Sequence, residues 1–137
     1  MKTVIIDGIE YVPKVTVEEK KEFDYTTIKF LEDACRYFDD DTSRRPQETT
    51  DEWAYRMLKM IALVVNNGWT PDWNNNNQLK WFPWFNLNKE TGLVNVYTYC
   101  AASDTSPYFG SRLCFESKVK AKFIGNQFID LYKKFLL

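Results

Sequence analysis

The segment from residue 51 to residue 66 constrains the fold of this chain most strongly. Thr50 precedes it in the position of an N-cap, and Asp51 and Glu52 follow where acidic side chains complement the helix dipole. Gly68 ends the pattern, since glycine readily takes the left-handed conformation found at helix C-termini. This signature predicts a helix over 51–66 with one buried face, because its apolar residues recur at spacings of four, four and three: Trp53, Met57, Ile61 and Val64.

Two other segments have helical spacing. Apolar residues from about Thr27 to Phe38 predict a short helix over 26–38, which the acidic run 39–41 ends. Near the C-terminus, spacings of three and four predict a longer helix over 117–135, capped by Ser117. A glycine within this last helix, Gly125, predicts close packing there.

Strand-forming segments surround these helices. Asp7-Gly8 between two apolar runs predicts a hairpin over residues 3–12, because both loop residues of such a turn must reach positive φ. Runs of β-branched and aromatic residues predict strands near 81–86, 93–101 and 111–115. The sequence therefore predicts one α+β domain over residues 1–137, in which a small antiparallel sheet with all these strands packs against about three helices.

Composition excludes several classes of chemistry. The 137 residues include no histidine, which removes His-dependent nucleophilic triads and histidine metal ligation. The chain also has no glycine-rich phosphate loop, no Gly-x-Ser-x-Gly turn and no metal-ligand spacing. We therefore expect a protein that is not an enzyme and that uses no cofactor and no metal.

Hydropathy and cysteine usage predict a cytoplasmic location. No run approaches the roughly 18 apolar residues that a transmembrane helix needs, and the first apolar run meets Asp7-Gly8 too soon for a signal peptide. Cys35, Cys100 and Cys114 are odd in number and widely spaced, which is typical of buried thiols in a reducing compartment. The net charge of −1 supplies no general attraction to membranes or nucleic acid, so we expect no membrane binding.

Aromatic residues make up 17% of the chain and concentrate between Trp69 and Phe85, where four of the five tryptophans lie. A run of four asparagines, 74–77, divides this aromatic segment, and Pro71 and Pro83 stiffen its two halves. Asparagine tolerates the left-handed region and bonds to its own backbone. The pattern therefore predicts a polar loop that presents the flanking aromatic rings.

Three interpretations of this aromatic segment are open. The rings can fold back over the sheet as a secondary core, or they can form a protein-binding surface, because Trp, Tyr and Arg are enriched in interface hot spots. In the third interpretation the rings stack on a nucleotide or single-stranded nucleic acid, the amides of the asparagines and of Gln78 read base edges, and Lys80 or Arg112 meets the phosphate. A second copy of the chain is a further candidate to cover such a surface.

Several short motifs together resemble a known group of proteins. The motifs are Trp69-Thr70-Pro71-Asp72-Trp73, Asn77-Gln78-Leu79-Lys80, Pro83-Trp84-Phe85 and Ser111-Arg112-Leu113-Cys114-Phe115, with Ser117, Ala121, Gly125, Gln127-Phe128 and Tyr132 after them and the Asp-Gly hairpin before them. With these residues the chain resembles small uncharacterised proteins encoded by phages, prophages and mobile elements of gut Bacteroidetes. The resemblance implies an accessory role in a bacterial cytoplasm and supplies no catalytic residues.

The sequence and the resemblance together predict a non-enzymatic accessory protein of a phage or mobile element that binds a protein partner through the aromatic segment. Binding of a nucleotide or of single-stranded nucleic acid by aromatic stacking is the alternative. The candidate binding residues are the same in both cases: Trp69, Asp72, Trp73, Asn77, Gln78, Lys80, Trp81, Trp84 and Arg112.

Overall fold

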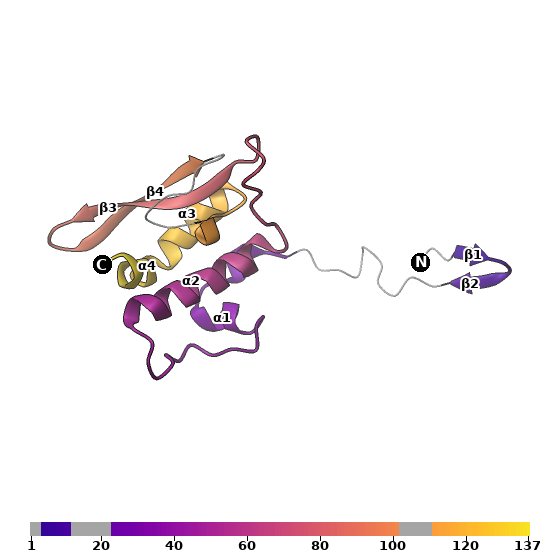
Figure 1. Ribbon diagram of the computed structural model, residues 1–137, viewed down its shortest axis with the longest axis horizontal. Helices are drawn as coiled ribbons and strands as arrows, with labels where there is room; N and C mark the ends of the chain where they lie inside the picture. Colours follow the sequence, from indigo (N-terminus) through magenta and orange to yellow (C-terminus); the bar gives the residue numbers. More distant parts are fainter. Residues whose placement is uncertain (1–3, 12–22, 102–110) are drawn as a thin grey trace.

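The computed structural model describes residues 4–11, 23–101 and 111–137, and it has the predicted α+β class (Figure 1). Its elements, in chain order, are β1 (Val4–Ile6), β2 (Ile9–Tyr11), the 3-10 turn η2 (Tyr25–Thr27), α1 (Leu31–Cys35), α2 (Thr50–Asn66), β3 (Lys80–Asn88), β4 (Gly92–Ala101), the 3-10 turn η3 (Ser111–Leu113), α3 (Lys118–Gln127) and α4 (Ile129–Leu136). In Figure 1, α3 and α4 lie between the β3–β4 sheet and α2, and α1 covers the far side of α2.

Helix α2 is the centre of the core, and the predicted helix is confirmed to within one residue. Its N-cap is Thr49 and not Thr50: the Thr49 hydroxyl accepts the Glu52 N–H at 3.4 Å and donates to the Glu52 carboxylate at 2.7 Å. At the other end Asn67 and Gly68 take positive φ angles of 45° and 92°. The apolar stripe of α2 is buried as its spacing predicts, with Ile61 fully enclosed.

The strands form two separate two-stranded sheets among the described residues, so the prediction of one common sheet is wrong. The predicted Asp-Gly hairpin is confirmed as β1 and β2, joined by Asp7 and Gly8 at φ 51° and 77°. Strands β3 and β4 pair antiparallel from Lys80 opposite Ala101 down to Asn88 opposite Gly92, with a bulge after Phe85. Both predicted strands of this second sheet are confirmed, and β3 continues past residue 86.

The predicted strand over 111–115 is wrong. Residues 111–113 form the turn η3, and only Phe115 pairs with β3, through two backbone hydrogen bonds with Trp81 of 2.9 and 2.7 Å. Pairing stops at Phe115 because the turn η3 precedes it and helix α3, capped by Ser117, follows it. On the side of this segment away from β3, the buried side chain of Asn66 holds the neighbouring backbone groups. Its amide donates to the Cys114 carbonyl at 2.9 Å, and its oxygen accepts the Glu116 N–H at 3.2 Å.

Both of the other predicted helices are broken in the structure. Only η2 and the five-residue α1 form within 26–38, because the Asp33 carboxylate accepts the N–H groups of Lys29 and Phe30 at 3.0 and 2.9 Å and starts the helix anew. The segment 117–135 divides into α3 and α4 at Phe128, whose φ and ψ are −116° and 31°. The break lets α3 pack on the sheet while α4 packs on α2.

Other predictions from the sequence have mixed outcomes. Ser117 caps α3 as expected, since its hydroxyl accepts the Lys120 N–H at 3.3 Å. The three cysteines are free, but only Cys35 and Cys114 are buried, and Cys100 on β4 is partly exposed. No helix in the described part of the chain has the length and apolar content that crossing a bilayer requires.

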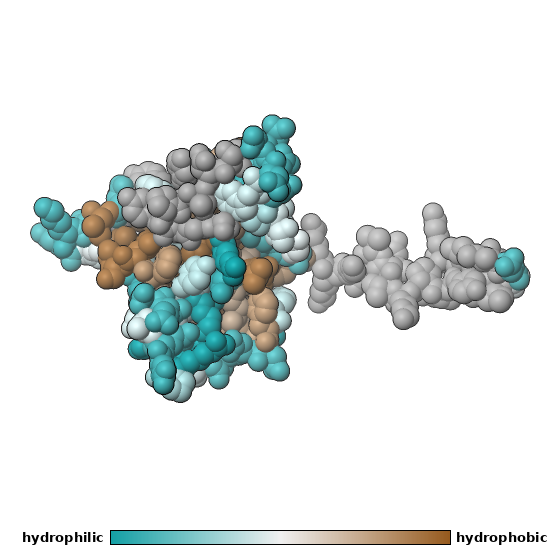
Figure 2. Space-filling model, in the orientation of Figure 1, coloured by the Kyte–Doolittle hydropathy of each residue, from teal (hydrophilic) through white to brown (hydrophobic). Residues whose placement is uncertain are grey.

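The loop between α1 and α2 is fixed to α2 by Arg56. This guanidinium donates to both carboxylate oxygens of Glu48, at 2.8 and 3.0 Å, and to Asp40 at 3.2 Å. Its hydrogen bonds with Glu48 are the main reason that the pKa of this carboxyl falls from 4.5 to about 2. The surface of this region is hydrophilic (Figure 2), and the buried Trp53 also holds the loop through the hydrogen bond from its indole N–H to the Thr42 carbonyl at 3.0 Å.

The Glu48–Arg56 pair should make the fold acid-sensitive. Because the pKa of Glu48 is lower in the folded chain, the pair stabilises the fold fully above about pH 4.5, and this contribution is lost as the pH falls towards 2. In thermal unfolding followed by circular dichroism, we expect Arg56→Met to melt lower than wild type at pH 6 and to lose less on acidification. The control is Arg36→Met, which removes an exposed arginine 4.0 Å from Asp33. Parallel acid profiles for wild type and Arg56→Met would contradict this prediction.

Candidate functional site

The loop that follows α2, residues 69–79, is closed by its own polar side chains. The Asp72 N–H donates to the Gln78 side-chain oxygen at 2.5 Å, and the Gln78 amide nitrogen donates to the Thr70 carbonyl at 3.4 Å. The Asp72 carboxylate accepts the Asn74 N–H at 3.0 Å. Gln78 therefore ties the two ends of the loop together, and Asp72 shapes its first turn. The polar loop expected from the asparagine run is present.

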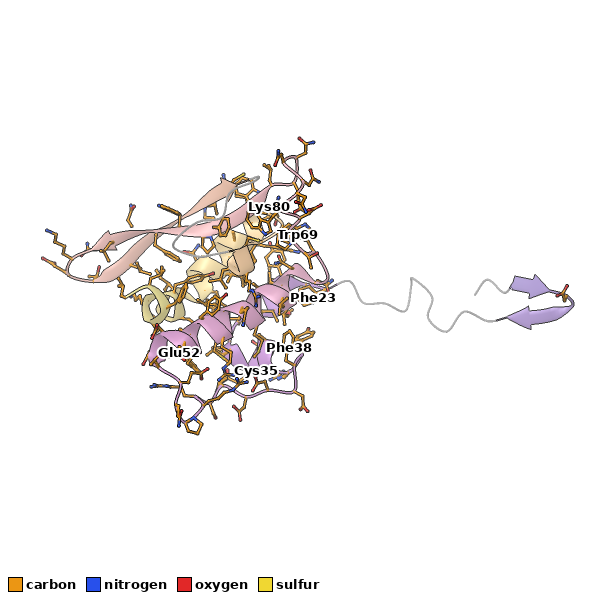
Figure 3. The ribbon with its side chains drawn as sticks, viewed as in Figure 1. Phe23, Cys35, Phe38, Glu52, Trp69 and Lys80 are labelled. Atoms are coloured by element: carbon orange, nitrogen blue, oxygen red, sulfur yellow. The ribbon has the colours of Figure 1, made fainter. Side chains whose placement is uncertain are left out.

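Lys80 supports this loop from inside the molecule. Its side chain is fully buried, and its ammonium donates to the Asn75 carbonyl at 3.1 Å and lies 5.0 Å from the centre of the Trp73 ring system. Figure 3 shows Lys80 and Trp69 on the same side of the molecule, at the end of α2 away from Glu52. Lys80 therefore lies behind the loop. A lysine that contacts a phosphate, as the sequence predicts for Lys80, would have to lie on the outer surface.

The four tryptophans of the aromatic segment are divided between two places. All four are partly buried and pack against the core, so none is fully enclosed. Trp69 and Trp73 lie in the loop after α2, whereas Trp81 and Trp84 lie in β3. Residues three apart in a strand point to opposite faces, so Trp81 and Trp84 do not share a surface. The segment is both a secondary core and a partly exposed aromatic surface.

Trp69 and Trp73 line a pocket of about 320 Å³ between the loop, the last turns of α2 and the turn η3. This volume is at the small end of the range for ligand sites in proteins. We call it the Trp69–Trp73 pocket. The side chains that give it its character come from all three segments: Lys59 and Leu63 from α2, Trp69, Pro71 and Trp73 from the loop, and Arg112 from η3.

The floor of the pocket offers few polar groups to a ligand. Asn66 lines it, but both ends of its amide are bound to the backbone around Cys114. Burial raises the pKa of the Cys114 thiol to about 11, so this thiol is neutral at physiological pH. The walls are apolar, and the charged groups among the described lining residues are the cations Lys59 and Arg112.

The structure brings together three of the nine predicted binding residues, Trp69, Trp73 and Arg112, in this pocket. Asp72 and Asn77 are exposed on the adjoining loop, and Gln78 is partly buried beneath it. Trp81 and Trp84 are not among the residues that line the pocket, and Lys80 lies inside the molecule.

The sequence analysis missed the contribution of α2 to this pocket. Leu63 is 55% exposed, although it lies on the central helix of the core. It lies off the buried stripe of α2, and that position was the available signal. Lys59, one turn earlier, lies with its ammonium 5.2 Å from the ring centre of Tyr55 and extends the same face.

Two larger hollows, of about 460 and 550 Å³, adjoin Phe30 at the start of α1. Both have side chains of opposite charge in their lining, with Lys29 and Glu32 in the first and Lys29 and Asp33 in the second. None of the nine predicted residues lies there. A second exposed apolar patch, beside the β3–β4 turn and the end of α4, includes Leu87 and Leu137 (Figure 2). Neither region combines aromatic walls with charges of one sign.

Clustered metal ligands do not occur among the described residues, where no three Cys, Asp or Glu side chains gather around a common point. The function of the pocket is therefore inferred from its own shape and charge. Comparisons with protein-family models, with curated proteins and with solved structures find no match to this chain.

Proposed function

We propose that this chain is a non-enzymatic accessory protein that binds a protein partner at the Trp69–Trp73 pocket. The observation that carries the proposal is the meeting of Trp69, Trp73 and Arg112 with the exposed Leu63 around one apolar hollow. Tryptophan and arginine are enriched among the residues that dominate binding energy at protein interfaces. The resemblance to mobile-element proteins of gut Bacteroidetes supports the proposal that the chain acts in the cytoplasm of a bacterium that carries the element.

Nucleotide or single-stranded nucleic-acid binding is the alternative, and the geometry favours it less. Stacking of single strands needs cations that follow the phosphates, and recognition of a particular base also needs amides free to meet its edges. Gln78 uses both side-chain polar atoms to close the loop, and Lys80 is buried behind it. Among the groups invoked for this role, Arg112 remains as an exposed cation at the pocket.

The proposal is tested with two matched leucine substitutions. Leu63→Asp places a charge in the pocket wall, and Leu87→Asp makes the same change at another exposed leucine, which lies outside the pocket. In affinity capture from host and phage-infected lysates, we expect wild type and Leu87→Asp to retain one common partner. We expect Leu63→Asp to retain it at least about tenfold less, a loss of roughly 1.4 kcal/mol, with an unchanged circular dichroism spectrum.

Two results would contradict the proposal. The first is capture of no partner by wild type, and the second is equal capture by Leu63→Asp. The nucleic-acid alternative is followed in parallel by tryptophan fluorescence, which a base stacked on an indole should quench. Quenching by mixed oligonucleotides at low salt that Leu63→Asp abolishes would favour the alternative.

A further inference from the structure

The charge of the Trp69–Trp73 pocket indicates what kind of partner segment it accepts. We propose that the pocket binds a short peptide segment in which acidic side chains flank bulky apolar ones. This inference rests on the proposed function, because it takes a protein partner as given and specifies its chemistry. It depends on three features of the pocket: its apolar walls, the cations in its lining, and the position of the neighbouring acids outside that lining.

The walls of the pocket suit apolar side chains. Trp69, Pro71 and Trp73 form one side, and Leu63 of α2 forms another. The side-chain amide of Asn66 on the floor is buried and already donates and accepts a hydrogen bond within the chain, so it is a weak attraction for a polar ligand. A volume of about 320 Å³ holds a few side chains and not a large ligand. Burial of apolar side chains is therefore the main attraction that this space can offer.

The charged side chains at the pocket have one sign. Lys59 and Arg112 line it from α2 and η3, and the described lining residues include no carboxylate. The Lys59 ammonium lies 5.2 Å from the Tyr55 ring centre, so part of its charge is directed towards that ring. Arg112 is exposed. Its planar guanidinium suits bidentate recognition of a carboxylate, which makes it the principal contact for an acidic side chain.

The acids nearest in sequence to the pocket, Asp72 and Glu116, are not among the described residues that line it. The Asp72 carboxylate accepts the Asn74 N–H within the loop. Glu116 forms an ion pair with Lys120, which also lies over the Tyr25 ring. Glu116 is thus neutralised by a lysine, while Asp72 keeps its negative charge and bonds within the loop. Complementary charge mainly sets specificity and the association rate, so an acidic partner gains from a pocket that keeps its positive sign.

An acidic peptide fits these features better than a nucleic acid. A strand of nucleic acid is held by a groove whose cations follow successive phosphates. The described lining of this pocket supplies two cations on separate segments, together with walls that favour apolar contacts. A peptide whose aliphatic and aromatic side chains lie between two carboxylates can contact the apolar walls and the two cations at the same time.

The test is a tryptophan-fluorescence titration of the full chain with three capped hexapeptides. The probes are acetyl-Gly-Asp-Leu-Phe-Asp-Gly-amide and its twins with Asn or Lys in place of both Asp residues. At low salt we expect the Asp peptide to bind at least about tenfold more tightly than the Asn peptide. This preference should shrink in 0.5 M NaCl, where the Debye length falls to roughly 4 Å.

Charge reversal at the pocket supplies the control. In the Arg112→Glu variant we expect the preference to change sign, so that the Lys peptide binds more tightly than the Asp peptide. Arg36→Glu makes the same change at an exposed arginine outside the pocket and should leave the wild-type order intact. An unchanged order in Arg112→Glu would overturn the inference.

The remaining outcomes separate this inference from the proposed function. Equal binding of the Asp and Asn peptides would overturn the charge preference and leave the pocket as a protein-binding site. Binding of none of the peptides, with a lysate partner that Leu63→Asp releases, would also overturn the inference alone. Absence of both peptide binding and a captured partner would overturn the two together. Tighter binding of a ten-nucleotide oligothymidylate than of the Asp peptide would replace the peptide by nucleic acid.

Discussion

Phe82→Ala should lower the free energy of unfolding by about 3–5 kcal/mol, the usual cost of removing a buried aromatic ring. Phe82 lies in β3 and is fully buried in the core, in the middle of the aromatic segment. A single domain has roughly 5–15 kcal/mol of stability in total, so this variant should lose a large share of it. Urea unfolding followed by circular dichroism measures the loss as a lower midpoint with an unchanged slope.

The matched control for Phe82→Ala lies in the same strand. Leu87 is 65% exposed, and Leu87→Ala should change the free energy of unfolding by less than about 0.5 kcal/mol. A cost below about 1 kcal/mol for Phe82→Ala would mean that β3 is not held by this ring. The aromatic segment would then lack the structural role that the burial of Phe82 indicates.

Asn66→Ala should be nearly as costly, although the side chain is polar. The change leaves the Cys114 carbonyl and the Glu116 N–H without the Asn66 amide that now satisfies them. A buried group without its hydrogen bond costs about 1–3 kcal/mol, so we expect a loss of roughly 2–5 kcal/mol in urea unfolding. The Trp69–Trp73 pocket should also widen, because Asn66 joins α2 to the segment that carries Arg112.

Two further substitutions separate the bonds of Asn66 from its bulk. Asn66→Asp keeps the acceptor for the Glu116 N–H but loses the donor for the Cys114 carbonyl, and it should still be destabilised. Asn126→Ala removes an exposed asparagine that bonds only to the preceding turn of α3, and it should cost less than about 0.5 kcal/mol. Equal stability of Asn66→Ala and Asn126→Ala would contradict the bridging role.

Elements whose determinants are local were predictable from the sequence. Helix α2 has its cap, its apolar stripe and its stop within one stretch of chain, and the prediction differs from the structure by one residue at the start. The hairpin of β1 and β2 follows from Asp7-Gly8, and β3 and β4 follow from their β-branched and aromatic runs. Each of these patterns is complete without knowledge of the rest of the fold.

Predictions failed where a distant or a competing partner decides the structure. Residues 111–115 have the composition of a strand, but η3 and the start of α3 confine the pairing to Phe115, and Asn66, 48 residues before Cys114, holds the backbone on the side away from β3. Helical spacing over 26–38 does not indicate that the Asp33 carboxylate accepts the N–H groups of residues 29 and 30. The turn at Phe128 arises because one straight helix cannot follow both the sheet and α2, and spacing alone does not contain that geometry.

Only part of the candidate site was predictable, because some of its residues are marked in the sequence and others join it only through the fold. Trp69 and Trp73 are marked by composition, and Arg112 by its place in the motif that carries the resemblance. Burial of Lys80 was not predictable, because an isolated lysine is almost always exposed and its enclosure depends on the final path of the loop. Leu63 and Lys59 join the site only because the loop folds back along α2.

The origin of the pocket in separate segments limits which molecules can stand in for the protein. Its walls come from α2, from the loop after α2 and from η3, and the Asn66 amide holds the first and last of these together across 48 residues of sequence. A synthetic peptide that spans only residues 69–85 contains Trp69 and Trp73 but lacks Leu63 and Arg112. Such a linear fragment cannot reproduce the surface, so a competitor or an immunogen directed at it must be the folded chain.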